Sequence, residues 1–327
     1  MDPFAPVGKA RFLFYLNKIQ LILDTADSAE NPAMALYQED LRTPLFMLEG
    51  LSRLYKKIAD GKKLKKLNEL FKDLEDHLGA IDYYDGFHKE FLEKKTIPQE
   101  ITEYIEDQRT QKADDLNDEL KKKRWIGKRR NGVSKIITEL DKMDWFDEKN
   151  DMLAVQKVYR KDIKKVIKKY KRKNLHFDNI EEDVHELRRE LRWLSIYPQA
   201  LCGLMQVKEN AEPPAFLKKY LTPEIVHSLF NVMPDGGALQ YHIMLNDHYF
   251  YALSWIIAEL GKLKDSGLRI EILKESLSAV YRTNEDVEQL AYSISGPNQP
   301  TIPEILARSE QIATTFFEED ILKNILT

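Results

Sequence analysis

Apolar residues recur every three or four positions along most of this chain, which is the period of an amphipathic α-helix. The clearest example runs from residue 183 to residue 197. Its apolar face holds Val184, Leu187, Leu191 and Leu194. Alternation at period two, the pattern of a half-buried strand, is nearly absent. The hydrophobic pattern therefore predicts an all-α protein.

The same period and the helix-breaking residues predict where other helices lie. The predicted helices cover residues 8–27, 31–61, 99–125, 152–173, 223–231 and 240–263, with one more beginning near residue 62 and two or three after residue 264. Pro44 is expected to interrupt the 31–61 helix, because proline cannot donate a backbone hydrogen bond. Asp178 is the expected N-cap of the 183–197 helix, and we expect the pattern to change after Pro198.

Hydrogen-bond donors form a second stripe along the 183–197 helix. His185, Arg188, Arg192 and Ser195 lie about 100° around the helix from its apolar face. A stripe of this kind can line a groove between helices, where an anion meets several charged donors at once. The alternative is that these residues simply face water, as charged residues on amphipathic helices usually do.

Three motifs occur in the same order as in a known helical family. They are His185-x-x-Arg188-x-x-x-Arg192, the Tyr159-Arg160 pair before it, and Leu260-Gly261-Lys262-Leu263-Lys264-Asp265 after it. Together they resemble the signatures of the CHAD family, the conserved-histidine α-helical domains. Trp193 and Ser195 stand where that family usually has basic residues.

CHAD domains are all-helical, are built from two related halves and bind inorganic polyphosphate through basic side chains. The resemblance therefore implies two quasi-repeated helical bundles, which we place at residues 1–150 and 151–327. It also implies binding of a linear polyanion, inorganic polyphosphate above all, in a basic groove between the bundles. The donors implied in the groove are His185, Arg188, Arg189 and Arg192, with Arg42 opposite them.

The first half carries an imperfect copy of the signature. Arg42 lines up with Arg188, and Gly79 with Gly261, but Glu39 replaces the histidine and Phe46 replaces Arg192. We expect Glu39 to repel a phosphate and the first side of the groove to have lost positive charge. The second copy is longer between its arginine and its glycine, which predicts an insertion of one or two helices there.

The predicted helix at 152–173 is the most basic segment of the chain. Its cations include Arg160, Lys161, Lys164, Lys165 and Lys168, for which we expect a role in attracting the polyanion. Like charges four residues apart destabilise a helix. Two groups could offset them, a bound anion or the nearby acids at 181–183. A solvated outer face is equally compatible with the pattern. A second basic run covers residues 121–130.

Composition narrows the classes of function. The net charge is −4, so an anion site must be local. The single cysteine, Cys202, excludes an intramolecular disulfide and is expected to be a buried packing residue. No apolar run is long enough to span a bilayer and we find no secretory signal, so we expect a cytoplasmic protein that does not bind a membrane.

Catalytic motifs are missing from the sequence. It contains no glycine-rich phosphate loop, no nucleophile elbow and no cysteine cluster, and His242 and His248 lack metal-site spacing. We therefore expect a binding protein, with no enzymatic activity, cofactor or metal.

Two alternatives to polyphosphate binding stay open. One is a scaffold that has lost the ligand and docks an acidic protein, and the other is a nucleic-acid binder, which the acidic balance disfavours.

Overall fold

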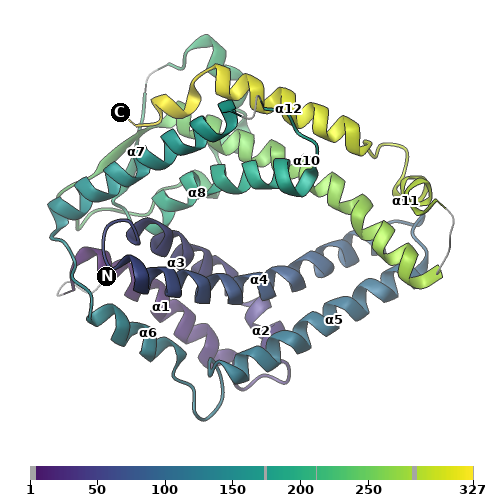
Figure 1. The fold of residues 1–327 in the computed structure, drawn as a ribbon, viewed down its shortest axis with the longest axis horizontal. Helices are drawn as coiled ribbons and strands as arrows, with labels where there is room; N and C mark the ends of the chain where they lie inside the picture. Colours follow the sequence, from purple (N-terminus) through teal and green to yellow (C-terminus); the bar gives the residue numbers. More distant parts are fainter. Residues whose placement is uncertain (1–4, 173–174, 211, 282–285, 327) are drawn as a thin grey trace.

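Helices make up most of the chain that the structure describes (Figure 1). The computed structural model describes residues 5–172, 175–210, 212–281 and 286–326. The predicted all-α class is confirmed. The first part of the chain forms α1 (Val7–Ala26), α2 (Pro32–Gln38), α3 (Arg42–Tyr55), α4 (Gly61–Leu92), α5 (Gln99–Lys122) and α6 (Gly132–Asp141).

The second part forms α7 (Glu148–Arg172), α8 (Glu186–Ala200), α9 (Pro223–Val226), α10 (Asp247–Tyr281), α11 (Val287–Ser295) and α12 (Ile302–Glu318). A π-helical turn, Ile180–His185, runs directly into α8. Short 3₁₀ turns lie at Ala215–Tyr220, Leu229–Asn231 and Ile321–Asn324. No helix in the described ranges combines the length and the apolar character needed to cross a membrane.

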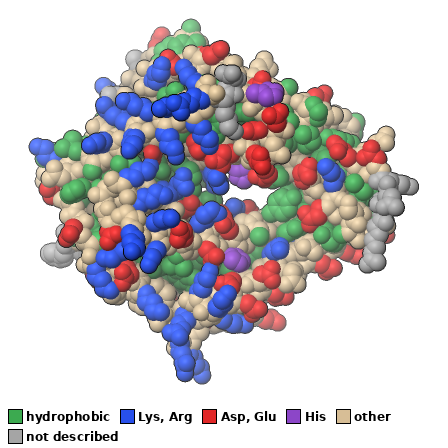
Figure 2. Space-filling view, viewed as in Figure 1, with side chains coloured by type: hydrophobic (Ala, Val, Ile, Leu, Met, Phe, Trp, Pro, Cys, Tyr) green, Lys and Arg blue, Asp and Glu red, His purple; other side chains and the backbone are tan. Residues whose placement is uncertain are grey.

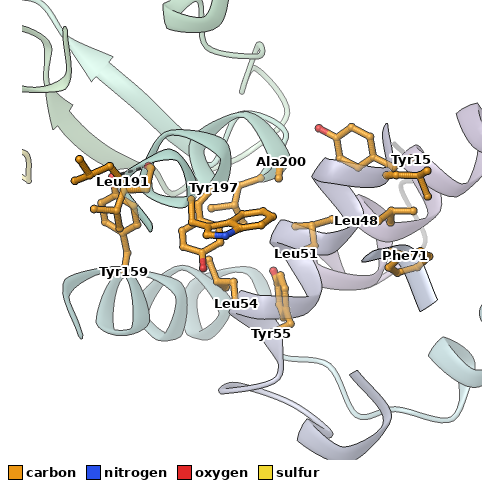
Figure 3. Packing of buried hydrophobic residues seen from close by; sticks show 14 of the residues in the cluster. Tyr15, Leu48, Leu51, Leu54, Tyr55, Phe71, Tyr159, Leu191, Tyr197 and Ala200 are labelled. Atoms are coloured by element: carbon orange, nitrogen blue, oxygen red, sulfur yellow. Dashed lines mark hydrogen bonds between the residues drawn. The ribbon is translucent and has the colours of Figure 1, made fainter. Parts of the chain in front are cut away.

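One large hydrophobic core joins the two parts of the chain. Figure 3 shows Leu51 and Leu54 of α3 beside Tyr197 of α8. Tyr15 of α1 belongs to the same core, and its hydroxyl donates to the Gln199 carbonyl of α8 at 2.9 Å. Gly50 allows α3 to approach α8 closely, because a Cβ there would lie 3.1 Å from a side-chain carbon on α8. Both predicted bundles contribute to this core, and their boundary at residue 150 stays a prediction.

A buried ion pair also links α1, α3 and α7. Arg11 lies with one Nη atom 2.5 Å from an Asp151 carboxylate oxygen, and the Tyr55 hydroxyl donates to the other oxygen at 2.7 Å. All three side chains are buried in the core. Because a charge buried without its partner is very costly, Arg11 and Asp151 depend on each other.

A second, smaller core joins the two parts again at their far end. It packs Phe91 of α4 and Ile101 of α5 against Ile270 and Leu273 of α10. Beside it, Arg269 of α10 donates from Nε to Glu90 of α4 at 2.6 Å. The two cores leave the helices α3 and α4 facing α8 and α10 across the space between them (Figure 1).

Two predicted helix limits in the first half are corrected. The helix expected at 31–61 is two helices, α2 and α3, separated at Asp40, which has a left-handed φ of 52°. Pro44 does not interrupt a helix, because it lies in the first turn of α3, where a missing N–H breaks no helical hydrogen bond.

Predictions around α8 also need correction. Asn179, and not Asp178, caps the helix, since its side chain accepts from the backbone N–H groups of Glu181 and Glu182. The expected change after Pro198 comes slightly later, because α8 continues through Pro198 to Ala200.

The insertion in the second half differs most from the prediction. Residues 240–246 were expected to be helical, but Ile243–Asn246 forms strand β2, which pairs in parallel with β1 (Met205–Lys208). The helix expected at 223–231 shrinks to the single turn of α9 and a 3₁₀ turn. The insertion therefore holds a two-stranded sheet and short turns in place of one or two full helices.

Candidate functional site

A cleft of about 920 Å³ lies between α3 and α4 on one side and α8 and α10 on the other. Figure 2 shows an opening in the middle of the molecule, with acidic side chains beside it and basic side chains gathered to its left. The charged and aromatic residues that line the cleft are Arg42, Phe46, Glu49, Arg53, Lys72, Glu75, Asp76, Asp82, Tyr83, Phe87, Glu90, Glu181, His185, Arg188, Arg189, Arg192, Trp193, Lys264 and Asp265. The structure thus brings the five groove residues that we predicted, from α3 and α8, into one cleft.

Helix α8 supplies the donor stripe, because its buried leucines fix which face turns to the cleft. Arg188 donates from Nε to the backbone carbonyl of Ile257 on α10 at 3.1 Å. Its guanidinium lies against Gly261, where a Cβ would come within 3.0 Å of Nε. Within the described chain Arg188 has no carboxylate partner at ion-pair distance, and burial lowers its pKa.

Arg192 is the least compensated charge in the cleft. Its guanidinium carbon lies 4.5 Å from the centre of the Phe46 ring, a cation–π contact. Its Nε atom is buried and has no hydrogen-bond partner among the described residues. Burial, followed by the nearby charge of Arg188, lowers the pKa of Arg192 to about 10. An anion entering the cleft would offset both effects.

Arg42 faces these residues from α3 but is already paired. It donates to Glu75 at 2.7 Å and to Asp82, both on α4. A Cβ at Gly79 would lie 3.0 Å from one of its guanidinium nitrogens. Arg42 and Gly79 therefore pack as Arg188 and Gly261 do, in the two pairs that the sequence aligned. The duplication itself stays a prediction.

Glu49 was missed by the sequence analysis although it lies at the centre of the cleft. Its residue is only 3% exposed, and its carboxylate comes no nearer than 4.0 Å to Arg53. Burial raises the pKa of Glu49 to about 7. Spacing could have identified it, because Arg42, Phe46, Glu49 and Arg53 recur at helical intervals on one face of α3.

Lys72, Glu75, Asp76 and Glu90, which also line the cleft, were missed as well. By contrast, Glu39 is exposed at the end of α2 and does not line the cleft, which corrects the expected repulsion from that position. Phe46, which replaces a basic residue, instead supports the guanidinium groups of Arg42 and Arg192. Trp193 similarly lies under Arg53, at 4.5 Å.

The basic residues of α7 lie outside the cleft. Arg160, Lys161, Lys164 and Lys168 are exposed and make no ion pair with any described residue. Basic side chains gather over the region of α7 in Figure 2. Among the acids at 181–183, Glu181 pairs with His185, and Asp183 accepts from the backbone N–H groups of Asp178 and Asn179. Toward the end of α7, Lys169 pairs with Glu186 and Glu190 on α8 and Lys171 pairs with Asp320, while Lys173 lies outside the described residues.

Lys165 belongs to a second cavity of about 150 Å³ between α3, α7 and α8. Arg53 and Trp193 line both this cavity and the cleft, so the two adjoin. Burial, followed by the charges of Arg53 and Lys57, lowers the pKa of Lys56 in the second cavity. Cations are thus crowded along a route that leads from the cleft to α7.

Other predicted features lie away from the cleft. The basic run at 121–130 forms the connection between α5 and α6, where Arg130 pairs with Asp24 and Asp27. Cys202 is buried, which confirms its predicted packing role. The described residues contain no group of three or more His, Cys, Asp or Glu side chains that could hold a metal ion.

Comparisons with models of protein families, with curated proteins and with solved structures gave no match. The resemblance to CHAD domains therefore depends on the three sequence motifs alone. The chemistry of the cleft must be read from its own geometry. It presents two guanidinium groups on α8 that have no carboxylate at ion-pair distance among the described residues, and a set of paired charges on α3 and α4. Fixed guanidinium donors of this kind suit the oxygen atoms of phosphate.

Proposed function

We propose that this protein binds a phosphate-rich linear polyanion, inorganic polyphosphate, in the cleft between α3–α4 and α8–α10, without catalysing a reaction on it. The observation that carries the proposal is the pair Arg188 and Arg192. Both guanidinium groups are largely desolvated, and within the described chain neither has a carboxylate at ion-pair distance. A folded protein gains no stability from such an arrangement.

Electrostatics of the outer surface support the same proposal. Cations of α7 that have no ion-pair partner among the described residues lie on the outer surface, and basic side chains gather on the left of Figure 2. The second cavity adds Arg53, Lys56, Lys57 and Lys165, beside the carboxylates of Asp162 and Glu190. A polyanion gains affinity by releasing its condensed counterions onto such a surface, and the gain falls as salt rises. The net charge of −4 gives the whole molecule no attraction of this kind, so the surface must act locally.

The test is calorimetric titration with polyphosphate at about 50 and about 200 mM salt. Wild type is compared with the double variant Arg188→Glu, Arg192→Glu. The control, Lys121→Glu, Lys128→Glu, makes the same charge change on two exposed residues, one in the last turn of α5 and one in the loop before α6. We expect salt-sensitive binding that the first variant loses and the control keeps. Equal loss in both variants would contradict a role for the cleft, and no binding by wild type would end the polyphosphate proposal.

A protein-interaction scaffold is the second candidate, because the exposed cations of α7 could instead meet an acidic protein surface. Near the inserted segment, Leu229, Phe230 and Val232 are also strongly exposed, at 85%, 79% and 62%. This candidate predicts no difference between the Arg188→Glu, Arg192→Glu variant and wild type in any binding assay. Displacement of polyphosphate by transfer RNA would instead favour a nucleic-acid ligand.

A further inference from the structure

Arg42 and Arg188 lie on opposite sides of the cleft and are packed in the same way. Arg42 of α3 lies against Gly79 of α4, and Arg188 of α8 lies against Gly261 of α10. A Cβ on either glycine would lie 3.0 Å from a guanidinium nitrogen of its arginine. Each guanidinium therefore rests directly on a long helix because the glycine has no side chain, and both arginines line the same cleft.

The group that accepts a hydrogen bond from Nε differs between the two arginines. Four residues before the glycine of α4 stands Glu75, whose carboxylate accepts from Arg42 at 2.7 Å. Four residues before the glycine of α10 stands Ile257, whose backbone carbonyl accepts from Arg188 at 3.1 Å. A carboxylate neutralises the guanidinium charge, whereas a backbone carbonyl satisfies one donor and leaves the charge in place.

The position three residues after each glycine differs as well. On α4 it is Asp82, which accepts from a terminal guanidinium nitrogen of Arg42. On α10 it is Lys264, which pairs with its neighbour Asp265 at 3.2 Å. Two carboxylates thus hold Arg42, and the corresponding positions beside Arg188 supply none. The difference in free charge between the two sides of the cleft comes from Glu75 and Asp82, and not from the packing of the arginines.

Arg42 is close enough to the α8 side to share a ligand with it. The Phe46 ring centre lies 5.3 Å from the guanidinium carbon of Arg42 and 4.5 Å from that of Arg192. Both guanidinium groups therefore contact the same aromatic ring. The side chain of Arg42 is also 30% exposed, so a phosphate bound at Arg192 lies within reach of Arg42 once its carboxylates are removed.

We propose that Glu75 and Asp82 limit the affinity of the cleft, because they occupy Arg42 and leave only the α8 side to bind phosphate. Without these carboxylates, Arg42 becomes a second phosphate subsite. This inference rests on the proposed function and names the residues that restrict that same site. A ligand cannot simply replace the carboxylates in wild type, because the Glu75 side chain is only 9% exposed and its charge would be left buried without a partner.

The test frees Arg42 by changing both carboxylates to amides, Glu75→Gln, Asp82→Asn. By calorimetry at about 100 mM salt, we expect this release variant to bind polyphosphate about tenfold more tightly than wild type. The slope of log affinity against log salt should steepen by about one, the effect of one more phosphate contact. Adding Arg42→Gln should remove both gains, because the new contact is made by that guanidinium.

The matched control is Glu69→Gln, Asp73→Asn. It removes the same two charges from ion pairs on α4 that do not line the cleft, and we expect its affinity to stay within about twofold of wild type. A release variant that gains no more than this control, or a gain that survives Arg42→Gln, would overturn the inference and leave polyphosphate binding intact. No binding by wild type would instead contradict the proposed function.

A milder variant covers the case in which changing the buried Glu75 unfolds the protein. Asp82 is 48% exposed, and asparagine can still accept the hydrogen bond that Tyr37 donates to it at 3.2 Å. We expect Asp82→Asn alone to raise the affinity several-fold and to lose that gain with Arg42→Gln. Affinity equal to that of wild type in this folded variant would count against the inference.

Discussion

Some charged side chains in the cleft lower the stability of the folded protein. Arg192 is largely desolvated, has no carboxylate at ion-pair distance in the described chain and is repelled by Arg188. Glu49 is almost fully buried and is held no closer than 4.0 Å to a cation. Residues of this kind destabilise the folded state unless a ligand compensates their charge. Substitutions at these positions are therefore expected to affect the free energy of unfolding and the affinity for the ligand differently.

Arg192→Met should stabilise the protein and weaken binding. Methionine retains an apolar stem over Phe46 but removes the desolvated charge. We expect the free energy of unfolding to rise by about 1 kcal/mol and polyphosphate affinity to fall about tenfold. Chemical denaturation and calorimetry measure the two effects. Arg189→Met, which removes an exposed arginine paired with Glu186, is the control and should raise stability little. A destabilised Arg192→Met protein would contradict the argument.

Glu49 should make stability depend on pH. Its folded-state pKa of about 7 lies above the usual value for glutamate, so the folded protein binds the proton more tightly than the unfolded chain. Stability contributed by Glu49 is therefore present at low pH and is lost as pH rises through about 7. The charged groups facing it are Arg53 on α3, Lys72, Glu75 and Asp76 on α4, and Arg192 on α8.

Removing the carboxylate by Glu49→Gln should flatten this pH dependence. Between about pH 5 and about pH 8 we expect wild type to lose roughly 2 kcal/mol of unfolding free energy relative to the variant. Urea denaturation at the two pH values measures the difference. Glu69→Gln on the exposed side of α4 is the control and should follow wild type. A variant that loses stability as steeply as wild type would show that another group titrates.

The elements themselves show how far sequence patterns reach. Periodicity located the long helices, because each has one apolar face over four or more turns. It missed the break at Asp40, where a single residue in the left-handed region separates α2 from α3. It also missed β1 and β2, since two four-residue strands that pair across an insertion leave no repeating pattern.

The candidate site was predictable only in part, for a similar reason. Motif spacing found Arg42, Arg188 and Arg192 because each lies on a face fixed by buried leucines. The sequence did not reveal that Arg42 is paired with Glu75 and Asp82, because those carboxylates belong to another helix. Nor did it reveal that Arg192 lacks a carboxylate partner among the described residues. The free positive charge is therefore on the α8 side of the cleft, a result of packing between helices.

Close packing between α8 and α10 can be tested at Gly261. An alanine Cβ at this position would meet Arg188 Nε at 3.0 Å, so the guanidinium must move. We expect Gly261→Ala to weaken polyphosphate binding several-fold while the free energy of unfolding is unchanged or slightly raised, since alanine favours a helix by about 1 kcal/mol over glycine. Gly86→Ala is the matched control, because a Cβ there meets nothing within 4 Å. Equal binding by the two variants would contradict a role for the position of Arg188.

The whole molecule holds together through contacts between residues far apart in the chain. The large core includes side chains from α1 to the last 3₁₀ turn, and the second core joins α4 and α5 to α10 and α11. Arg11 and Asp151, 140 residues apart, make the most buried ion pair among the described residues. Neither predicted half contains all the partners that its own buried groups require.

Asp151→Asn should therefore destabilise the whole protein. It leaves the Arg11 charge buried without a counter-charge, and we expect the free energy of unfolding to fall by about 3 kcal/mol or more. Chemical denaturation monitored by circular dichroism measures the loss. Glu139→Gln, which breaks an exposed pair with Lys142, is the control and should cost under about 1 kcal/mol. Similar stabilities for the two variants would mean that the buried pair does not stabilise the fold.

The distance in sequence between Arg11 and Asp151 also has a consequence during synthesis. A ribosome that adds roughly 5–20 residues each second needs roughly 7–28 s to pass from one partner to the other. During that interval α1 can be made but its buried arginine has no carboxylate to meet. The buried arrangement of α1, α3 and α7 around this arginine can therefore form only after Asp151 has been made, however early the apolar faces of α1 and α3 meet.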